Sequence, residues 1–292
     1  MNRDKIKKIA YSFGKLLGFL GLIYIFYKLS KEYSLSSFIE KFSNFKSIIL
    51  PLLILNILSS IIGIYAWHIM LKTYAKKSFG YISSYYYFAK TEISKYLPGN
   101  IFHFVGRQAL SSKLGISQAQ MAKISLLFML ILMVATVISS TIFALFSNIE
   151  NYIKILMLFA SVASIIAILY IYPIFTKAKK ALMVSILTFS IGLQGVLLSI
   201  IILWQIKEPT LTLFFEVSSI YIISWLIGFV TPGASGGLGV REGAFIAIAE
   251  FINLNVDSNI VIFSVLLVRL INIVVDIIMY ISTFLITKKV IV

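Results

Sequence analysis

Long uncharged hydrophobic runs alternate with short polar segments along most of the chain. A membrane-spanning helix needs about 20 consecutive apolar residues, and six runs have this length: residues 9–27, 47–71, 124–146, 155–175, 181–206 and 258–287. The middle four contain no Asp, Glu, Lys or Arg, whereas the first holds Lys15 and the last holds Arg269 and Asp276. The pattern predicts an all-α, polytopic membrane protein with six full spans.

Two further segments, residues 78–123 and 210–252, are apolar but interrupted by glycine, proline and charge. Irregular backbone is tolerated at membrane depth only where it is buried in protein or lines a wet cavity. We therefore predict that each segment forms a re-entrant Pro-Gly hairpin or a broken helix pair. With the six spans, the hairpins bring the total to about eight transmembrane elements.

Composition and charge agree with a membrane protein and give it an orientation. The 292 residues are 60% hydrophobic and 13% charged, with a net charge of +15, which excludes an ordinary soluble globule. Lysine runs between the spans predict a multi-pass protein of the cell membrane with both termini cytoplasmic, although loop 28–46 fits this rule poorly. No basic face belongs to a soluble fold, so we expect no nucleic-acid binding.

Several kinds of chemistry are absent from the sequence. There is no Cys, and His68 and His103 are the only histidines, so we expect no disulfide, thiolate nucleophile or metal site. No phosphate loop or Ser/His/Asp order is present, and we expect no cofactor.

The two interrupted segments share a pattern. In each, a Pro-Gly pair is followed by Arg nine residues after the proline, with Gly near the Arg: Pro98, Gly99, Gly106 and Arg107, then Pro232, Gly233, Gly236, Gly237, Gly239 and Arg241. The single membrane domain then divides into two units of span, span, hairpin and span, at about 9–147 and 152–287. Three crossings are an odd number, so the second unit is expected to be inverted, an architecture typical of transporters.

The hairpin residues are the candidate substrate site. Half-helix N-termini suit a phosphate, and Arg107 and Arg241 would add bidentate donors while Glu242 balances charge. The alternative is that these glycines and prolines only mark kinks or close helix packing.

Three further polar residues lie at predicted membrane depth. Arg269 and Asp276 are two turns apart on one face of the last span; they either form a structural ion pair with a hairpin or handle a headgroup or proton. His103 either senses pH or hydrogen-bonds a headgroup, or is a satisfied interior residue.

The stretches Tyr96-Leu-Pro-Gly-Asn-Ile-Phe-His-Phe-Val-Gly-Arg107 and Thr231-Pro-Gly-Ala-Ser-Gly-Gly-Leu-Gly-Val-Arg-Glu-Gly243 resemble the two signature stretches of the lysylphosphatidylglycerol synthase transmembrane region, also described as flippase-like membrane proteins. The similarity covers nearly the whole chain in span order. It implies the flippase half of such a synthase. Only four residues follow Lys288, so we do not expect the soluble aminoacyltransferase domain or synthase activity.

Three functions follow as hypotheses. The first is a flippase for an anionic or aminoacylated phospholipid of the lysyl-phosphatidylglycerol type, or for a polyprenyl-linked glycan. The second is a membrane enzyme, such as a glycosyltransferase or acyltransferase on a lipid carrier. The third is a scaffold without transport. The expected partners are a membrane lipid and a separate synthase or glycan-assembly enzyme.

Overall fold

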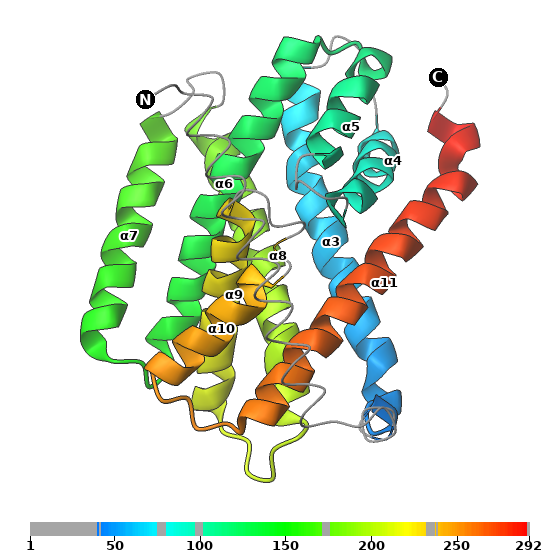
Figure 1. The fold of residues 1–292 in the computed structure, drawn as a ribbon. Helices are drawn as coiled ribbons and strands as arrows, with labels where there is room; N and C mark the ends of the chain where they lie inside the picture. Colours follow the sequence, from blue (N-terminus) through cyan, green and yellow to red (C-terminus); the bar gives the residue numbers. More distant parts are fainter. Residues whose placement is uncertain are drawn as a thin grey trace, which may run out of the picture.

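The computed structural model describes residues 40, 42–74, 80–96, 102–170, 176–231, 237 and 239–290, and this part of the chain contains helices and no strand (Figure 1). The expected first span at 9–27 lies outside the described residues. So do five of the hairpin residues: Pro98, Gly99, Pro232, Gly233 and Gly236.

Within the described residues, six helices are long and apolar enough to cross a membrane. They are α3 (Lys46–Tyr74), α6 (Gln118–Leu145), α7 (Asn151–Tyr170), α8 (Lys177–Leu203), α9 (Leu211–Val230) and α11 (Ser258–Val290). Five coincide with predicted spans, which confirms a multi-pass membrane architecture. The sixth, α9, lies in the segment predicted to be a hairpin; its 20 residues make it as long as a span.

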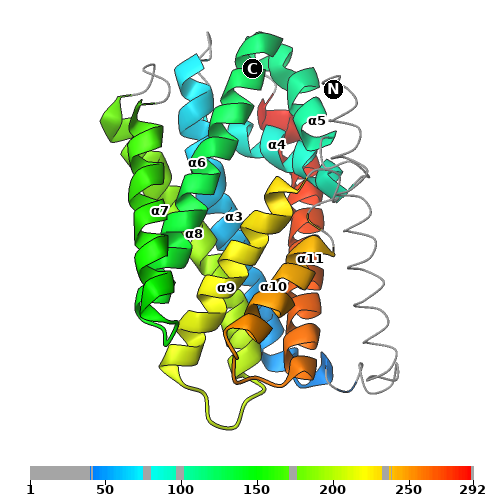
Figure 2. The same ribbon diagram turned by 60° about the vertical axis from the view of Figure 1, so that its left-hand side comes forward.

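The remaining helices are short. They are α4 (Tyr81–Glu92), η1 (Ile93–Tyr96), α5 (Phe102–Leu110), η2 (Ser111–Leu114) and α10 (Val240–Phe251). At a rise of about 1.5 Å per residue, α4 and α10 are each roughly 18 Å long, well below the roughly 30 Å of a hydrocarbon core. Figures 1 and 2 place α4 and α5 in one half of the bundle and α10 in the other half.

Side-chain caps determine where three of the long helices begin. The Ser117 hydroxyl accepts from the Gln120 backbone N–H at 3.3 Å, and the Gln120 side chain accepts in turn from the Ser117 N–H at 3.2 Å. The Thr176 and Thr210 hydroxyls cap α8 and α9 by accepting from the backbone N–H groups of Lys179 and Leu213. These caps satisfy backbone N–H groups that have no partner within the helix. Helices α6 and α8 therefore begin before the charged residues at which the predicted spans were cut.

Paired serines join the central helices. The Ser59 and Ser190 hydroxyls each donate to the other residue's carbonyl oxygen at 2.8 Å, which links α3 to α8. Ser140 and Ser219 do the same between α6 and α9, at 2.9 and 3.0 Å. Small hydroxyl side chains let helix backbones approach closely inside a membrane. We refer to these two reciprocal pairs as the serine clips.

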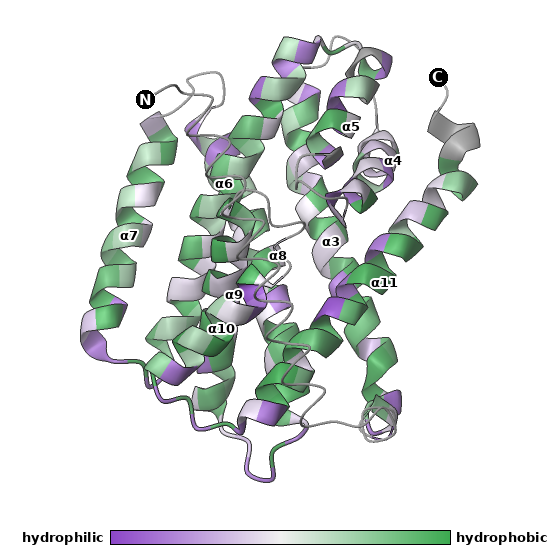
Figure 3. Cartoon of the chain, in the orientation of Figure 1, coloured by the Kyte–Doolittle hydropathy of each residue, from purple (hydrophilic) through white to green (hydrophobic). Residues whose placement is uncertain are grey.

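The outer surface of the bundle is apolar. Figure 3 shows hydrophobic residues along the outward sides of the long helices. Helix α7, at the edge of the bundle beside α6 (Figures 1 and 2), has only Ser161 and Ile168 buried. Its Leu156 and Phe159 are about 70% exposed, at 68% and 71%. Exposed apolar surface on this scale is typical of contact with lipid or with a protein partner.

Candidate functional site

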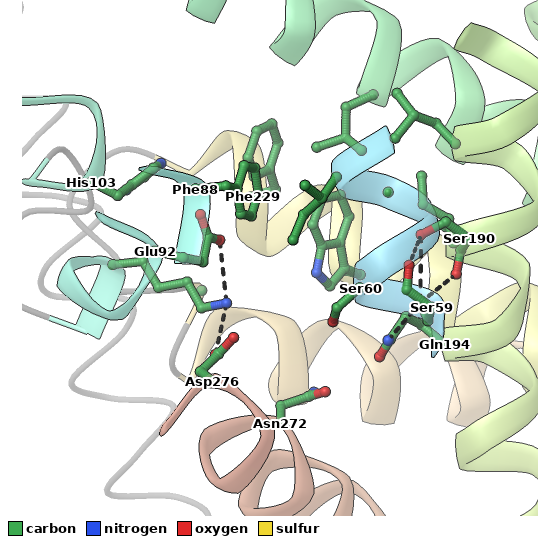
Figure 4. Close-up of a pocket in the computed structure, with 18 of the residues that line it drawn as sticks. Ser59, Ser60, Phe88, Glu92, His103, Ser190, Gln194, Phe229, Asn272 and Asp276 are labelled. Carbon is green, nitrogen blue, oxygen red and sulfur yellow. Dashed lines mark hydrogen bonds and ion pairs between the residues drawn. The ribbon is translucent and has the colours of Figure 1, made fainter. Parts of the chain in front are cut away.

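A cavity of about 240 Å³ lies among the long helices and the short helices α4 and α5. Three of the chain's four arginines line it: Arg107, Arg241 and Arg269. Figure 4 shows Glu92, Asp276 and His103 on one side and Ser59, Ser190 and Gln194 on the other. The cavity therefore has a charged side and a side of neutral hydroxyl and amide groups.

The neutral side lies in the interior of three spans. Asn56 of α3 donates through Nδ2 to Asn272 Oδ1 of α11 at 2.6 Å. Gln194 of α8 donates through Nε2 to Asn56 Oδ1 at 3.1 Å and to Ser59 Oγ at 3.0 Å. All three amides are at least nine residues from either end of their helices, so this side lies deep in the bundle.

Arg107 is fixed by the opposite arm of the first predicted hairpin. Its Nη2 donates to Glu92 Oε2 at 2.7 Å, so α5 is tied to the end of α4. The guanidinium also lies over the rings of Trp67 and Phe88, at 4.8 and 4.4 Å from their centroids. Its Nε has no hydrogen-bond partner among the described residues. An ion pair and aromatic faces thus hold the guanidinium at the cavity wall.

Arg241 is fixed within its own helical turn. Its Nη2 donates to Oε1 of the adjacent Glu242 at 3.2 Å, and Glu242 Oε2 accepts from the Gly239 N–H at 2.8 Å. Glu242 is not among the residues that line the cavity. It balances the charge of Arg241 from outside the cavity lining and caps the N-terminus of α10. An acidic side chain at this end also interacts favourably with the helix dipole.

Asp276 connects the last span to the first predicted hairpin. Its Oδ2 lies 2.8 Å from Lys95 Nζ and accepts from the Tyr96 hydroxyl at 2.5 Å. Lys95 also lies 3.3 Å from Glu92 Oε1. The Arg269 guanidinium lies over the Tyr96 ring, 5.4 Å from its centroid. An ion pair thus joins α11 to η1, with Lys95 as the basic partner of Asp276.

His103 and Glu92 lie in the short helices, outside the six candidate spans. Burial lowers the pKa of His103, so its ring is neutral near pH 7. Burial raises the pKa of Glu92, but Lys95 and Arg107 outweigh that effect and hold the pKa below its usual range. Nδ1 of His103 has no hydrogen-bond partner among the described residues.

Glycines allow the arms of each predicted hairpin to approach. A Cβ on Gly106 would lie 3.1 Å from the Thr91 Cγ2 methyl group, and one on Gly228 would lie 2.9 Å from Arg241 Cβ. Gly237 and Gly239 have φ angles of +74° and +77°, in the region that favours glycine. The sequence pattern thus marks places of close backbone approach.

The structure describes nine of the predicted site residues and brings six of them to one cavity, whereas Gly106, Gly239 and Glu242 do not line it. His103, Arg107, Gly237, Arg241, Arg269 and Asp276 line it. Sequence reasoning missed Glu92, Lys95 and Tyr96, which hold Arg107 and Asp276 in place. The spacing of Glu92 and Lys95, three residues apart, indicates a pair on one helix face, but nothing local in the sequence points to their partners.

No group of three or more His, Asp or Glu side chains within the described ranges could hold a metal ion. No model of a known protein family matches the chain, and no curated protein matches it in sequence.

Proposed function

We propose that the protein moves a phosphate-bearing lipid between the leaflets of a membrane, with Arg107, Arg241 and Arg269 holding the phosphate. The observation that carries this proposal is the excess of basic side chains around a cavity deep among the spans. Buried charge is costly in a membrane protein and usually marks a partner or a substrate path.

Among the described residues, four basic side chains line the cavity against two acidic ones: Lys95, Arg107, Arg241 and Arg269 against Glu92 and Asp276. Counting Glu242, which pairs with Arg241, leaves one basic side chain in excess. The sequence adds no acidic residue in the neighbouring segments 97–101 and 232–238. A bound anion would supply the charge that this balance lacks.

Guanidinium groups suit phosphate better than lysine does, because their planar fork makes two parallel hydrogen bonds. Arg107 and Arg241 approach the cavity from different elements, α5 and α10. The Nε atoms of both lack a hydrogen-bond partner among the described residues. Both atoms are buried, so each guanidinium has an N–H group that is not committed within the described protein and that a ligand could engage once the side chain turns toward the cavity.

The helix packing supports an inverted repeat. In the proposed repeat, α3 corresponds to α8, α4 to α9, and α6 to α11. Helix α6 packs on α9 while α4 packs on α11, and α3 and α8 pack on each other. This is the pattern that a two-fold exchange of the units requires, and inverted repeats around a central site are typical of transporters.

The proposal extends to the setting of the protein. It places the chain in the cell membrane with cytoplasmic termini, and the two Pro-Gly segments as re-entrant hairpins that meet at the cavity. The resemblance to flippase-like membrane proteins supports a cargo that is an anionic or aminoacylated phospholipid or a polyprenyl-linked glycan. A separate synthase or glycan-assembly enzyme would then supply the lipid.

A leaflet assay tests the proposal. Purified protein is reconstituted in liposomes with fluorescent phosphatidylglycerol, lysyl-phosphatidylglycerol or a polyprenyl-phosphate sugar, and access of an outside quencher is followed. We expect faster movement of at least one lipid, lost at least tenfold in Arg107→Ala with Arg241→Ala. The matched control, Lys113→Ala with Lys123→Ala, removes two positive charges from exposed positions outside the cavity. Unchanged transport in the double arginine variant would falsify the proposal.

A membrane enzyme is the second candidate, because His103 and Glu92 line the same cavity. A neutral histidine beside a carboxylate is a common acid–base pair. Chemical analysis of the lipids recovered from the same liposomes separates the two functions. A modified lipid together with no change of leaflet favours the enzyme.

A further inference from the structure

We infer that the neutral side of the cavity is a subsite for hydroxyl groups, so that the preferred ligand is a phosphate ester of glycerol or a sugar. An ester that carries an ammonium group would be disfavoured, so among the proposed cargoes the inference favours an anionic phospholipid or a polyprenyl-linked glycan over an aminoacylated phospholipid. This inference rests on the proposed function and specifies the headgroup that accompanies the phosphate.

The amide groups on this side keep hydrogen-bonding capacity after they have bonded to one another. Gln194 uses Nε2 to reach Asn56 and Ser59. Asn272 uses Oδ1 to accept from Asn56. Gln194 Oε1 and Asn272 Nδ2 have no hydrogen-bond partner in the described ranges. Neither atom is buried, so both remain accessible. Because both residues line the cavity, an acceptor and a donor face its space.

An acceptor and a donor on the same side of the cavity complement a headgroup with hydroxyl groups, because each hydroxyl donates one hydrogen bond and accepts others. An ammonium group donates only, so the Asn272 N–H groups would be left facing another donor. Sites built to hydrogen-bond a hydroxyl strongly reject ligands that lack it. The amide chemistry therefore favours a polyhydroxylated headgroup.

The carboxylates of the charged side are already committed. Glu92 is bound to Arg107 at 2.7 Å and to Lys95 at 3.3 Å. Asp276 is bound to Lys95 at 2.8 Å and to the Tyr96 hydroxyl at 2.5 Å. An ammonium group would have to displace a lysine or an arginine from these oxygens, and it would add positive charge to a lining that is already basic.

The size and walls of the cavity fit the same ligand. Its volume of about 240 Å³ is below the roughly 300–1,000 Å³ of pockets for drug-sized molecules, so it suits a headgroup with the lipid chains outside. Trp225 and Phe229 line it as a stacked pair, 5.0 Å apart with an interplanar angle of 11°. These rings offer an apolar surface on which the carbon face of a sugar ring can pack.

Three soluble probes test the inference on the purified full chain in detergent: inorganic phosphate, glucose 1-phosphate and phosphorylethanolamine. Their affinities are measured by titration calorimetry. We expect glucose 1-phosphate to bind about tenfold more tightly than inorganic phosphate, the gain of roughly one net hydrogen bond. We expect phosphorylethanolamine to bind no more tightly than inorganic phosphate. This comparison needs no variant, so it does not depend on how a substitution folds.

Variants then locate the subsite. Gln194→Met with Asn272→Leu should remove the gain for glucose 1-phosphate and leave the affinity for inorganic phosphate unchanged. Ser199→Ala is the matched control: it removes a hydroxyl that pairs α8 with α9 through Ser218 at 2.7 Å, outside the cavity lining. It should preserve both affinities.

The outcomes separate the inference from the proposed function. Equal binding of inorganic phosphate and glucose 1-phosphate, or tighter binding of phosphorylethanolamine, overturns the hydroxyl subsite alone. A gain that survives the Gln194 and Asn272 substitutions also overturns it. Failure of all three probes to bind overturns the arginine site, and the inference with it.

Discussion

The two Pro-Gly segments carry the same arginine motif but hold the arginine in different ways. In the first, Arg107 is bound by Glu92, which lies fifteen residues earlier on the opposite arm. In the second, Arg241 is bound by its neighbour Glu242, which also caps the same helix. The first arrangement ties α4 to α5, whereas the second stabilises the first turn of α10.

This difference shows that the shared motif determines the position of the arginine but not which carboxylate pairs with it. Glu92 contacts two basic side chains from two elements, Arg107 of α5 and Lys95 of η1. Glu242 contacts one basic side chain, Arg241, and one backbone N–H, that of Gly239. Removing each carboxylate should therefore have consequences of different size and extent.

The largest expected effect is that of Glu92→Gln. The change leaves Arg107 buried without a carboxylate partner, while Lys95 keeps Asp276, and breaking a buried ion pair costs about 3–5 kcal/mol. Glu242→Gln should cost about 1–3 kcal/mol, because the amide oxygen can still accept from Gly239. Denaturant unfolding of the purified protein in mixed micelles measures both.

Hydrogen exchange sharpens this comparison. Glu92→Gln should increase exchange in both α4 and α5, while Glu242→Gln should increase it only at the start of α10. Equal effects of the two substitutions, or changes confined to α4 in Glu92→Gln, would contradict a tie between the arms.

A smaller effect is expected where the arms approach closely. In Gly228→Ala the new Cβ would lie 2.9 Å from Arg241 Cβ and 3.3 Å from the Arg241 backbone, and overpacking of this kind costs about 1–3 kcal/mol. In Gly106→Ala the nearest contact is the Thr91 Cγ2 methyl group at 3.1 Å, which is side chain rather than backbone and needs only a small displacement, so we expect less than about 1 kcal/mol. The same unfolding measurement applies, and a larger loss at Gly106 would reverse the order of the two regions.

The smallest effect, and one of opposite sign, is expected at Gly243. It lies inside α10, and a Cβ built there has no atom within 4 Å. Gly243→Ala should stabilise the protein by roughly 0.5–1 kcal/mol, since glycine is unfavourable in a helix interior. A lower denaturant midpoint of unfolding for Gly243→Ala would contradict this, because it would mean that the added methyl group meets another part of the protein.

The long helices could be predicted from the sequence because an uncharged run of span length has few alternatives. Their starts were less accurate: the predicted span 124–146 corresponds to a helix that begins at Gln118. Lys123 interrupts the uncharged run but not the helix, whose start is set by the Ser117 cap. The Ser117 and Gln120 spacing is a capping-box signal, and it would have located this boundary.

The site was predicted in part. The motif located Arg107 and Arg241, and the cost of buried charge pointed to Arg269 and Asp276, all of which line one cavity. The partners of Arg107 and Asp276 depend on how α4 and η1 pack against α5 and α11. The sequence does not encode that packing as a local spacing, so Glu92 and Lys95 were found only in the structure.

The serine clips restrict how the bundle can change shape. In each clip the serine hydroxyl of either helix donates to the backbone carbonyl of the other, so sliding α3 past α8 by one residue, about 1.5 Å, would break two hydrogen bonds at once. The same holds for α6 and α9. The clips therefore oppose sliding of one helix along the other, while each clipped pair of helices can still move as a unit. Any motion that opened the cavity would therefore have to break contacts other than the clips, and the Lys95–Asp276 ion pair between η1 and α11 is one such contact.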